Sequence, residues 1–263
     1  MSYIPSVNIE MNTASDFRYI VTENAKLVAG NIVNSFNSGH HSFSIIGTYG
    51  TGKSSFIIAL EDDLANGNNK LVRKGVLGSV KGFEFLNIVG DYAPLGRLIS
   101  HKIGISDENP INALNTYYQS IRKQNKFLVI VVDEFGKILE HAANNNPEKE
   151  LYFLQKLSEF VNVPSRSIIL LTTLHQNFGS YAAKLTETQR NEWHKVKGRF
   201  QEIVFVEPVE QLLSLTAKRP NTHRQLSKGE ELSLSLLYDL GVRSKIVSRN
   251  LGYQTAESLY PLD

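Results

Sequence analysis

The sequence predicts an α/β fold of three layers, in which helices cover both faces of a central, mostly parallel five-stranded sheet, followed by a short C-terminal helical part. Two observations predict it. Five apolar runs of strand length alternate with segments of helical periodicity, and such crossover connections are typical of parallel strands. One run, 127–132, is continuously apolar and mostly β-branched, as expected for a central strand covered on both faces.

The elements follow in order from apolar spacing and from helix-ending residues. The expected strands are 43–46, 83–89, 127–132, 167–173 and 203–206. The expected helices are 54–64, 112–124, 135–143, one from Pro147 to before Pro164, a polar stretch up to Gly198, and 232–240. The first strand stops at Gly47, and the helix after it has its apolar side chains at helical spacing. Asn146 before Pro147 is typical of an N-cap followed by proline in the first turn.

Composition excludes several classes of protein. The chain has 263 residues, of which 41% are hydrophobic and 21% charged, so it is neither wholly disordered nor collagen-like nor a coiled coil. It has no cysteine, which excludes disulfides, thiolate zinc sites and thiol catalysis. No apolar run approaches the ~18–20 residues that span a bilayer, and the N-terminus lacks signal-peptide features. We therefore expect a cytoplasmic protein without a membrane partner.

Three parts are expected along the chain. Residues 1–41 form an N-terminal flanking segment, 42–210 the α/β core, and 211–263 a helical, lid-like part. The polar segment 218–230 carries a proline and a glycine and is expected to be a linker or loop. The sequence stops without an obvious closing element, so we expect the C-terminal part to be truncated.

The strongest functional signal is the segment 47–54, Gly-Thr-Tyr-Gly-Thr-Gly-Lys-Ser, which matches the phosphate-loop pattern G-x-x-x-x-G-K-[ST] in full. It follows an apolar strand and opens a helix, as the pattern requires. Glycines let the backbone curl so that N–H groups cradle phosphates, and the helix N-terminus adds partial positive charge. The residues expected to bind ATP are Gly47, Thr48, Tyr49, Gly50, Thr51, Gly52, Lys53, Ser54 and Ser55. Lys53 would reach the β- and γ-phosphates, and the Ser54 hydroxyl would ligate Mg²⁺.

A pair of carboxylates follows the third strand. Asp133 and Glu134 would lie at the carboxyl edge of the sheet, where ligands bind in open α/β folds. Asp133 would hold Mg²⁺, and Glu134 would orient and deprotonate the attacking water. A small-molecule kinase has no need of such a glutamate, and no Asn-Lys-x-Asp guanine reader occurs, since 125–128 begins like one but lacks the aspartate. ATP hydrolysis is therefore favoured, with Lys53 and Glu134 as catalytic residues.

The segments 47–54, 132–134, 168–173 and 198–200 together resemble the layout of AAA+ ATPases, over residues 42–210. The resemblance implies the strand order 5-1-4-3-2 in a P-loop NTPase core. It implies a polar sensor residue after the fourth strand, for which Thr173 is the first candidate and Thr172, His175 and Gln176 stay open as alternatives. It also implies an arginine finger near the fifth strand that acts on the ATP of a neighbouring subunit, for which Arg199 is the first candidate and Arg190 the second.

A longer pattern, 191–208, is similar to large ATP-binding proteins of bacterial anti-phage defence loci, in which the ATPase core is the N-terminal part. That similarity implies a motor or switch in a larger complex, as a homo-oligomer or with partner subunits, with DNA as a candidate partner. Two alternatives stay open: an ATPase of DNA transposition or replication, and a nucleotide-gated interaction module with little turnover.

The stretch 190–199 interleaves basic residues with Trp193, a combination that can bind a phosphate backbone and stack on a base. More often such a run is a solvated helix with one anchoring tryptophan, and we favour that interpretation. The net charge of +2 is too small to predict nucleic-acid binding by itself.

Overall fold

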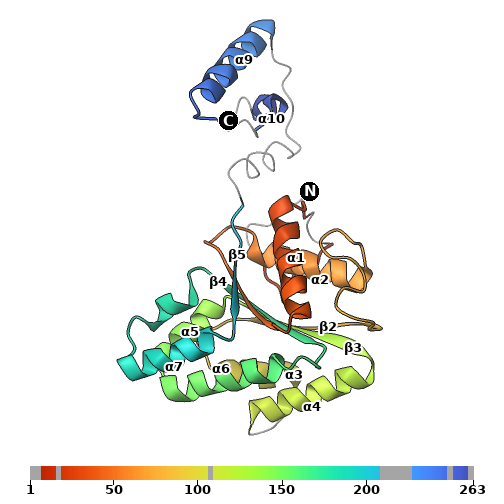
Figure 1. The fold of residues 1–263 in the computed structure, drawn as a ribbon, viewed down its shortest axis with the longest axis vertical. Coiled ribbons are helices and arrows are strands. Elements are labelled where there is room, and N and C mark those ends of the chain that lie inside the picture. Colours follow the sequence, from red (N-terminus) through yellow and green to blue (C-terminus); the bar gives the residue numbers. More distant parts are fainter. Residues whose placement is uncertain (1–6, 16–18, 106–108, 208–226, 248–250, 260–263) are drawn as a thin grey trace. The chain divides into compact units, whose positions relative to one another are not determined.

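The computed structural model describes residues 7–15, 19–105, 109–207, 227–247 and 251–259. The chain divides into two compact units, residues 1–206 and 207–263. The first unit holds the sheet and the phosphate loop (Figure 1). The predicted boundary between 210 and 211 lies outside the described residues.

The first unit is built on one parallel sheet of five strands. The strands are β1 (Ser42–Ile46), β2 (Gly82–Val89), β3 (Lys126–Asp133), β4 (Ile168–Leu174) and β5 (Gln201–Val204). Their spatial order is β2-β3-β4-β1-β5, which confirms the predicted order 5-1-4-3-2. Because β1, β3 and β4 are parallel neighbours, the phosphate loop after β1 and the acidic pair after β3 lie at the same edge.

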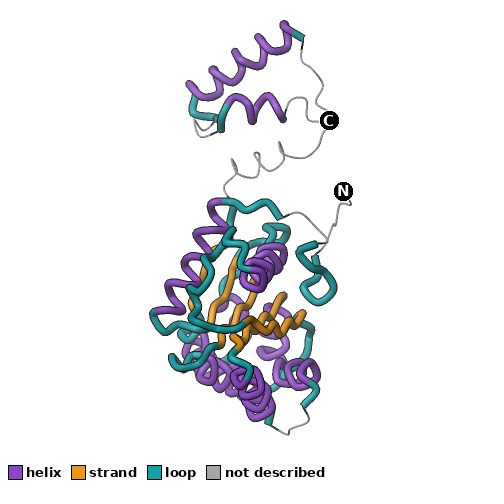
Figure 2. Tube along the Cα trace, turned by 90° about the vertical axis from the view of Figure 1, so that its right-hand side faces the viewer, coloured by secondary structure: helices purple, strands orange, loops and turns teal. Residues whose placement is uncertain are grey.

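Helices cover both faces of this sheet, which confirms the three layers (Figures 1 and 2). One face carries α1 (Glu23–Asn37) and α2 (Lys53–Asn66); the other carries α3 (Leu95–Ile103), α4 (Pro110–Lys123), α5 (Phe135–Asn144), α6 (Pro147–Val161) and α7 (Glu187–Lys197). Alternate side chains of β3 enter the two cores: Leu128, Ile130 and Val132 face one, and Phe127, Val129 and Val131 face the other. A strand buried on both faces has no polar side to alternate, so its sequence is continuously apolar.

Most predicted elements are present, with some differences at their ends. β5 runs over 201–204 rather than 203–206. The Phe205 N–H, one residue beyond the strand, still donates to the Ile46 carbonyl at 2.7 Å. The polar stretch before Gly198 contains a 3-10 turn, η1 (Phe178–Ala182), and then α7. The sequence interpretation missed α1, α3 and α10 (Tyr253–Ser258).

The second unit contains α9 (Lys228–Arg243) and α10 among its described residues. The prediction of a linker over 218–230 is wrong at its C-terminal end, because Ser227 and Glu230 form a capping box that starts α9. The rest of that linker, 218–226, lies outside the described residues. The two helices meet where the rings of Tyr238 in α9 and Tyr253 in α10 lie 5.5 Å apart, edge to face. The Tyr238 hydroxyl also donates to the Leu251 carbonyl just before α10. Over the described ranges, no helix is both long enough and apolar enough to cross a membrane.

Candidate functional site

The phosphate loop connects β1 to α2 through a tight backbone path. Gly50 and Gly52 have φ values of +76° and +85°, in the left-handed region that favours glycine. A Cβ on Gly47 would lie 2.4 Å from the Phe205 carbonyl oxygen, so this position also excludes a side chain. The Thr51 hydroxyl closes the loop by donating to the Thr48 carbonyl at 2.9 Å.

Lys53 is the first residue of α2 and is buried. Its ammonium donates to the carbonyls of Gly47 (2.6 Å) and Thr48 (2.9 Å), so it bends back over the loop. Burial lowers the pKa of Lys53, and the nearby Asp133 carboxylate opposes that shift. A desolvated ammonium with two carbonyl partners gains from an incoming anion, which makes this lysine suited to bind phosphate.

The loop, the start of α2 and the acidic pair line one pocket of 270 Å³. Its lining residues are Val7, Tyr49, Gly50, Gly52, Lys53, Ser54, Ser55, Asp133, Glu134 and His175. Gly52, the N-cap of α2, offers no side chain to the first-turn N–H groups, which leaves them for an anionic ligand. The Ser54 hydroxyl and the Asp133 carboxylate are hard oxygen ligands of the kind that Mg²⁺ prefers, so the donor set fits that ion.

Asp133 ends β3 and is held by its neighbour in β4. The Thr173 hydroxyl is buried, donates to Asp133 Oδ1 and accepts the Glu134 N–H at 2.9 Å. The predicted sensor Thr173 is therefore not a lining residue of the pocket; it fixes the two acidic residues that are. A hydrogen bond to a buried carboxylate is one of the stronger ones, and it sets the orientation of Asp133.

Glu134 is the N-cap of α5 and has a left-handed backbone, with φ 53° and ψ 36°. Such a conformation is uncommon for a residue other than glycine and clusters at functional sites. It turns the chain sharply from β3 into α5 and leaves Glu134 on the pocket wall. The Glu134 carboxylate forms an ion pair with Lys137 one turn along α5.

Three further residues belong to this region, of which the sequence interpretation named only His175, as an alternative sensor. His175 lines the pocket and stacks its ring on Tyr49 at 3.4 Å between centroids. Burial first, and then the charge of Lys53, lower the pKa of His175, which favours the neutral imidazole. Val7 lines the pocket from the N-terminal segment. Gly90, after β2, donates its N–H to the Asp133 carbonyl at 2.7 Å.

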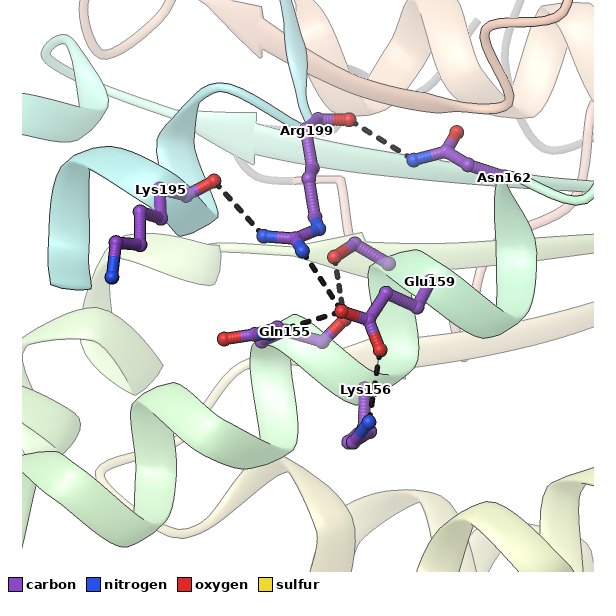
Figure 3. Close-up of polar contacts among 7 residues, drawn as sticks. Gln155, Lys156, Glu159, Asn162, Lys195 and Arg199 are labelled. Atoms are coloured by element: carbon purple, nitrogen blue, oxygen red, sulfur yellow. Dashed lines mark hydrogen bonds and ion pairs between the residues drawn. The ribbon is translucent and has the colours of Figure 1, made fainter.

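Arg199 is not among the residues that line this pocket. Figure 3 shows it beside Glu159, Lys195 and Asn162 instead. It precedes β5, and Gln201 pairs with Phe43 at the start of β1, whereas the phosphate loop follows the far end of β1. Four residues of strand, about 13 Å, separate the two positions, so Arg199 does not reach its own phosphate loop. Its guanidinium donates to Glu159 Oε1 at 2.8 Å and to the Lys195 carbonyl at 3.3 Å.

The stretch 190–199 is the solvated helix α7 with one anchoring tryptophan, as we favoured. Trp193 is fully buried and donates its indole N–H to the Phe178 carbonyl at 3.0 Å. A ring in that position cannot stack on a base. Three basic residues of this stretch, Lys195, Lys197 and Arg199, also have glutamate partners.

The comparisons with known proteins find structural likeness only. No protein-family model matches the sequence, and no curated protein matches it either. The Aeropyrum pernix ORC2 protein, solved as ADPNP-ADP complexes, is similar with a TM-score of 0.53 at 16% identity, over 92% of this chain and 62% of ORC2. The strand order, the position of the phosphate loop after β1 and the likeness to ORC2 all indicate the same fold. The chain has a P-loop NTPase fold of the AAA+ type.

The ADP form of the same ORC2 protein has a TM-score of 0.50 at 17% identity, over 93% of this chain and 64% of ORC2. The chain thus spans less than two thirds of the length of the ORC2 structures that it resembles.

Proposed function

We propose that this chain binds ATP with Mg²⁺ and hydrolyses the bond between the β- and γ-phosphates. The observation that carries the proposal is the meeting of Lys53, Ser54, Asp133 and Glu134 in one pocket, although they come from two distant segments. The shared fold with ORC2, which was solved with ADP and ADPNP, supports a nucleotide as the ligand.

Different groups of the chain would bind the phosphates and the Mg²⁺ ion. The N–H groups of the loop and of the first turn of α2 would hold the phosphate oxygens, and Lys53 would exchange its carbonyl partners for the β- and γ-phosphates. Ser54 and Asp133 would hold Mg²⁺, and Thr173 keeps the Asp133 carboxylate in place. When bound, Mg²⁺ supplies charge neutralisation on the phosphates.

Glu134 would accept a proton from the attacking water. Its carboxylate must first release Lys137, which now holds it. Because both side chains are more than one third exposed, solvent screens this ion pair and the exchange costs little.

The proposal is tested by measuring nucleotide binding and phosphate release in the same variants. Lys53→Ala should lose both, whereas Glu134→Gln should keep binding and lose release. Lys184→Ala and Glu140→Gln remove exposed side chains of the same types and should match the wild type. Equal turnover in Glu134→Gln and the wild type would show that Glu134 is not the base.

One contact favours a second candidate function, the nucleotide-gated interaction module. While Lys137 neutralises Glu134, the pocket can bind ATP but has no free base. Tight ATP binding without turnover in the wild type, together with turnover in Lys137→Ala, would favour that module over the ATPase.

We also propose a homo-oligomer in which Arg199 serves the pocket of a neighbouring subunit. Its support is the placement of Arg199 at the sheet edge opposite to its own phosphate loop. An arginine supplied in trans contributes about 10³–10⁵ in rate. A mixture of the inactive Arg199→Ala and Glu134→Gln variants should then regain turnover, because mixed neighbours combine an intact pocket with an intact arginine. No recovery in assembled mixtures would contradict the trans role.

The proposal extends from the activity to the biological setting in which the protein acts. The sequence similarity to ATP-binding proteins of anti-phage defence loci supports a motor or switch in such a complex. Cells that carry the gene in its natural locus should lose protection against phage when Glu134 is replaced by glutamine. Undiminished protection would contradict this role, while loss of DNA replication would support the replication alternative.

A further inference from the structure

The connection between α2 and β2 forms a second pocket, of 490 Å³, far from the nucleotide pocket. It lies at the amino edge of the sheet, because β2 begins where this connection ends, whereas the phosphate loop lies at the carboxyl edge. The buried Asp63 carboxylate shapes the connection by accepting three consecutive backbone N–H groups, those of residues 70–72, at 2.8–3.0 Å. A carboxylate with three such partners holds the segment in one conformation.

Cations surround this pocket. Residues 64–83 and 119–126 contain seven basic residues and no acidic one. Six of these are exposed and form what we call the basic rim: Lys70, Arg73, Lys74, Lys81, Arg122 and Lys123. Within the described ranges none of the six has a carboxylate partner.

Backbone contacts hold the two segments of the basic rim together. Gly82 and Lys126 are register partners at the start of β2 and β3, and the Lys81 N–H donates to the Asn125 carbonyl at 2.8 Å. The Asn125 N–H in turn donates to the Arg122 carbonyl at 2.9 Å. Figure 1 shows the α2–β2 connection and the end of α4 at the same end of these strands. The cations therefore share one edge of the molecule.

Three cations before β5, at the same edge, differ from those of the basic rim. Before β5, Lys195, Lys197 and Arg199 each have a glutamate partner. A paired cation must give up its carboxylate to bind a phosphate, whereas an unpaired one gives up water alone. The basic rim is thus the part of the amino edge whose charge is available to an anionic partner.

We propose that the basic rim binds the phosphate backbone of a nucleic acid. Exposed cations spread over two segments suit an extended polyanion better than one small anion. Among the apolar side chains of the connection, Leu71, Val72 and Leu77 are buried. Val76 and Val80 are partly buried against the same core, so the surface lacks the exposed apolar centre of a protein interface. Phe83 packs against Phe127 rather than standing free to stack on a base, so the binding is independent of sequence.

The salt dependence gives the size of the effect. If about four of the cations contact phosphates of a duplex, the logarithm of the association constant falls with the logarithm of salt with a slope of about −3.6. Affinity then drops about 10²-fold between 50 and 200 mM salt. Each contact that is removed makes the slope shallower by about 0.9.

The test is fluorescence anisotropy of the full chain with labelled duplex DNA, single-stranded DNA and duplex RNA, each in several unrelated sequences and over a range of salt. Lys74→Glu/Lys81→Glu should weaken binding at least 10-fold and make the slope shallower by about 1.8 for a duplex. The matched control, Arg97→Glu/Lys184→Glu, makes the same change of charge at exposed cations elsewhere and should bind as the wild type does.

The three probes identify which nucleic acid is bound, and loss of binding to that probe in the rim variant supports the proposal. No binding of any probe by the wild type, or equal weakening in the rim and control variants, overturns it. ATP hydrolysis is measured in the same samples, because the rim lies at the edge opposite to the nucleotide pocket. Wild-type turnover in the rim variant shows that it is folded and separates failure of this inference from failure of the proposed ATPase.

Discussion

Replacement of Gly90 by alanine should impair hydrolysis more than nucleotide binding. Gly90 contacts the backbone that positions the acidic pair: a Cβ there would lie 2.5 Å from the Glu134 carbonyl oxygen and 2.9 Å from that of Asp133. Real Cβ atoms essentially never approach other atoms within 3.0 Å. The Glu134 carbonyl must therefore retreat by about 0.5 Å, and its side chain moves with it.

The magnitudes follow from that displacement. Overpacking of a tight contact costs about 1–3 kcal/mol of the free energy of unfolding. A misplacement of ~1 Å lowers the rate by about 10²-fold, so half of that should lower kcat by about 10-fold. Nucleotide affinity should change little, because the phosphate loop and Lys53 are not touched.

The assay combines urea unfolding, nucleotide binding and phosphate release. Gly82→Ala is the matched control, since Gly82 begins the strand that Gly90 follows and a Cβ there meets no atom within 4 Å. If Gly90→Ala matches Gly82→Ala in both kcat and the free energy of unfolding, the proposed contact between β2 and the acidic pair is refuted.

Three other changes test other parts of the structure. Thr173→Val removes the hydroxyl that donates to Asp133 and should lower the free energy of unfolding in urea by about 1.5–3 kcal/mol. Thr173→Ser should recover most of this loss. A loss below about 0.5 kcal/mol, roughly the error of the measurement, would contradict the hydrogen bond. Burial raises the pKa of Glu61 to about 7, so the folded protein holds that proton more tightly than the unfolded chain does. The free energy of unfolding should accordingly fall by about 3 kcal/mol as the pH rises from 4.5 through 7, and Glu61→Gln should abolish this fall; an unchanged pH profile in that variant would count against it. Asp63→Ala leaves the N–H groups of 70–72 without their acceptor and should cost at least about 2 kcal/mol in the same assay, which an unfolding midpoint equal to that of the wild type would disprove.

The sequence predicted the sheet well for a physical reason. Strands of a parallel sheet with two covered faces are nearly continuous apolar runs, and runs such as 127–132 and 168–171 stand out without any knowledge of their partners. The edge strand β5 is short and one of its residues, Val204, is exposed, so its pattern is weaker and its ends were placed two residues late.

The missed parts depend on contacts between distant segments. Register places Val132 of β3 beside Thr172 of β4, which brings the next residues, Asp133 and Thr173, within hydrogen-bonding distance. Register cannot be read from either strand alone. The close approach of Gly90 to the acidic pair has the same origin.

Helix α1 was not predicted, although its sequence has the features of a helix start. Thr22 caps its N-terminus, Glu23 follows in the first turn, and Val28, Ile32 and Val33 share its buried face. The partners of surface charges are harder to predict, because the Glu159 that holds Arg199 lies on another helix, forty residues away in the sequence.

The central claim is that the pocket holding Lys53 and Glu134 hydrolyses ATP. The most direct measurement is the initial rate of phosphate release from ATP with Mg²⁺, for wild type and Glu134→Gln, over a range of protein concentrations. The account predicts turnover that rises more than proportionally with concentration in the wild type and is absent in Glu134→Gln, while both proteins bind ATP. Turnover that is equal in the two proteins, or ATP binding without turnover in every assembled state, would contradict it.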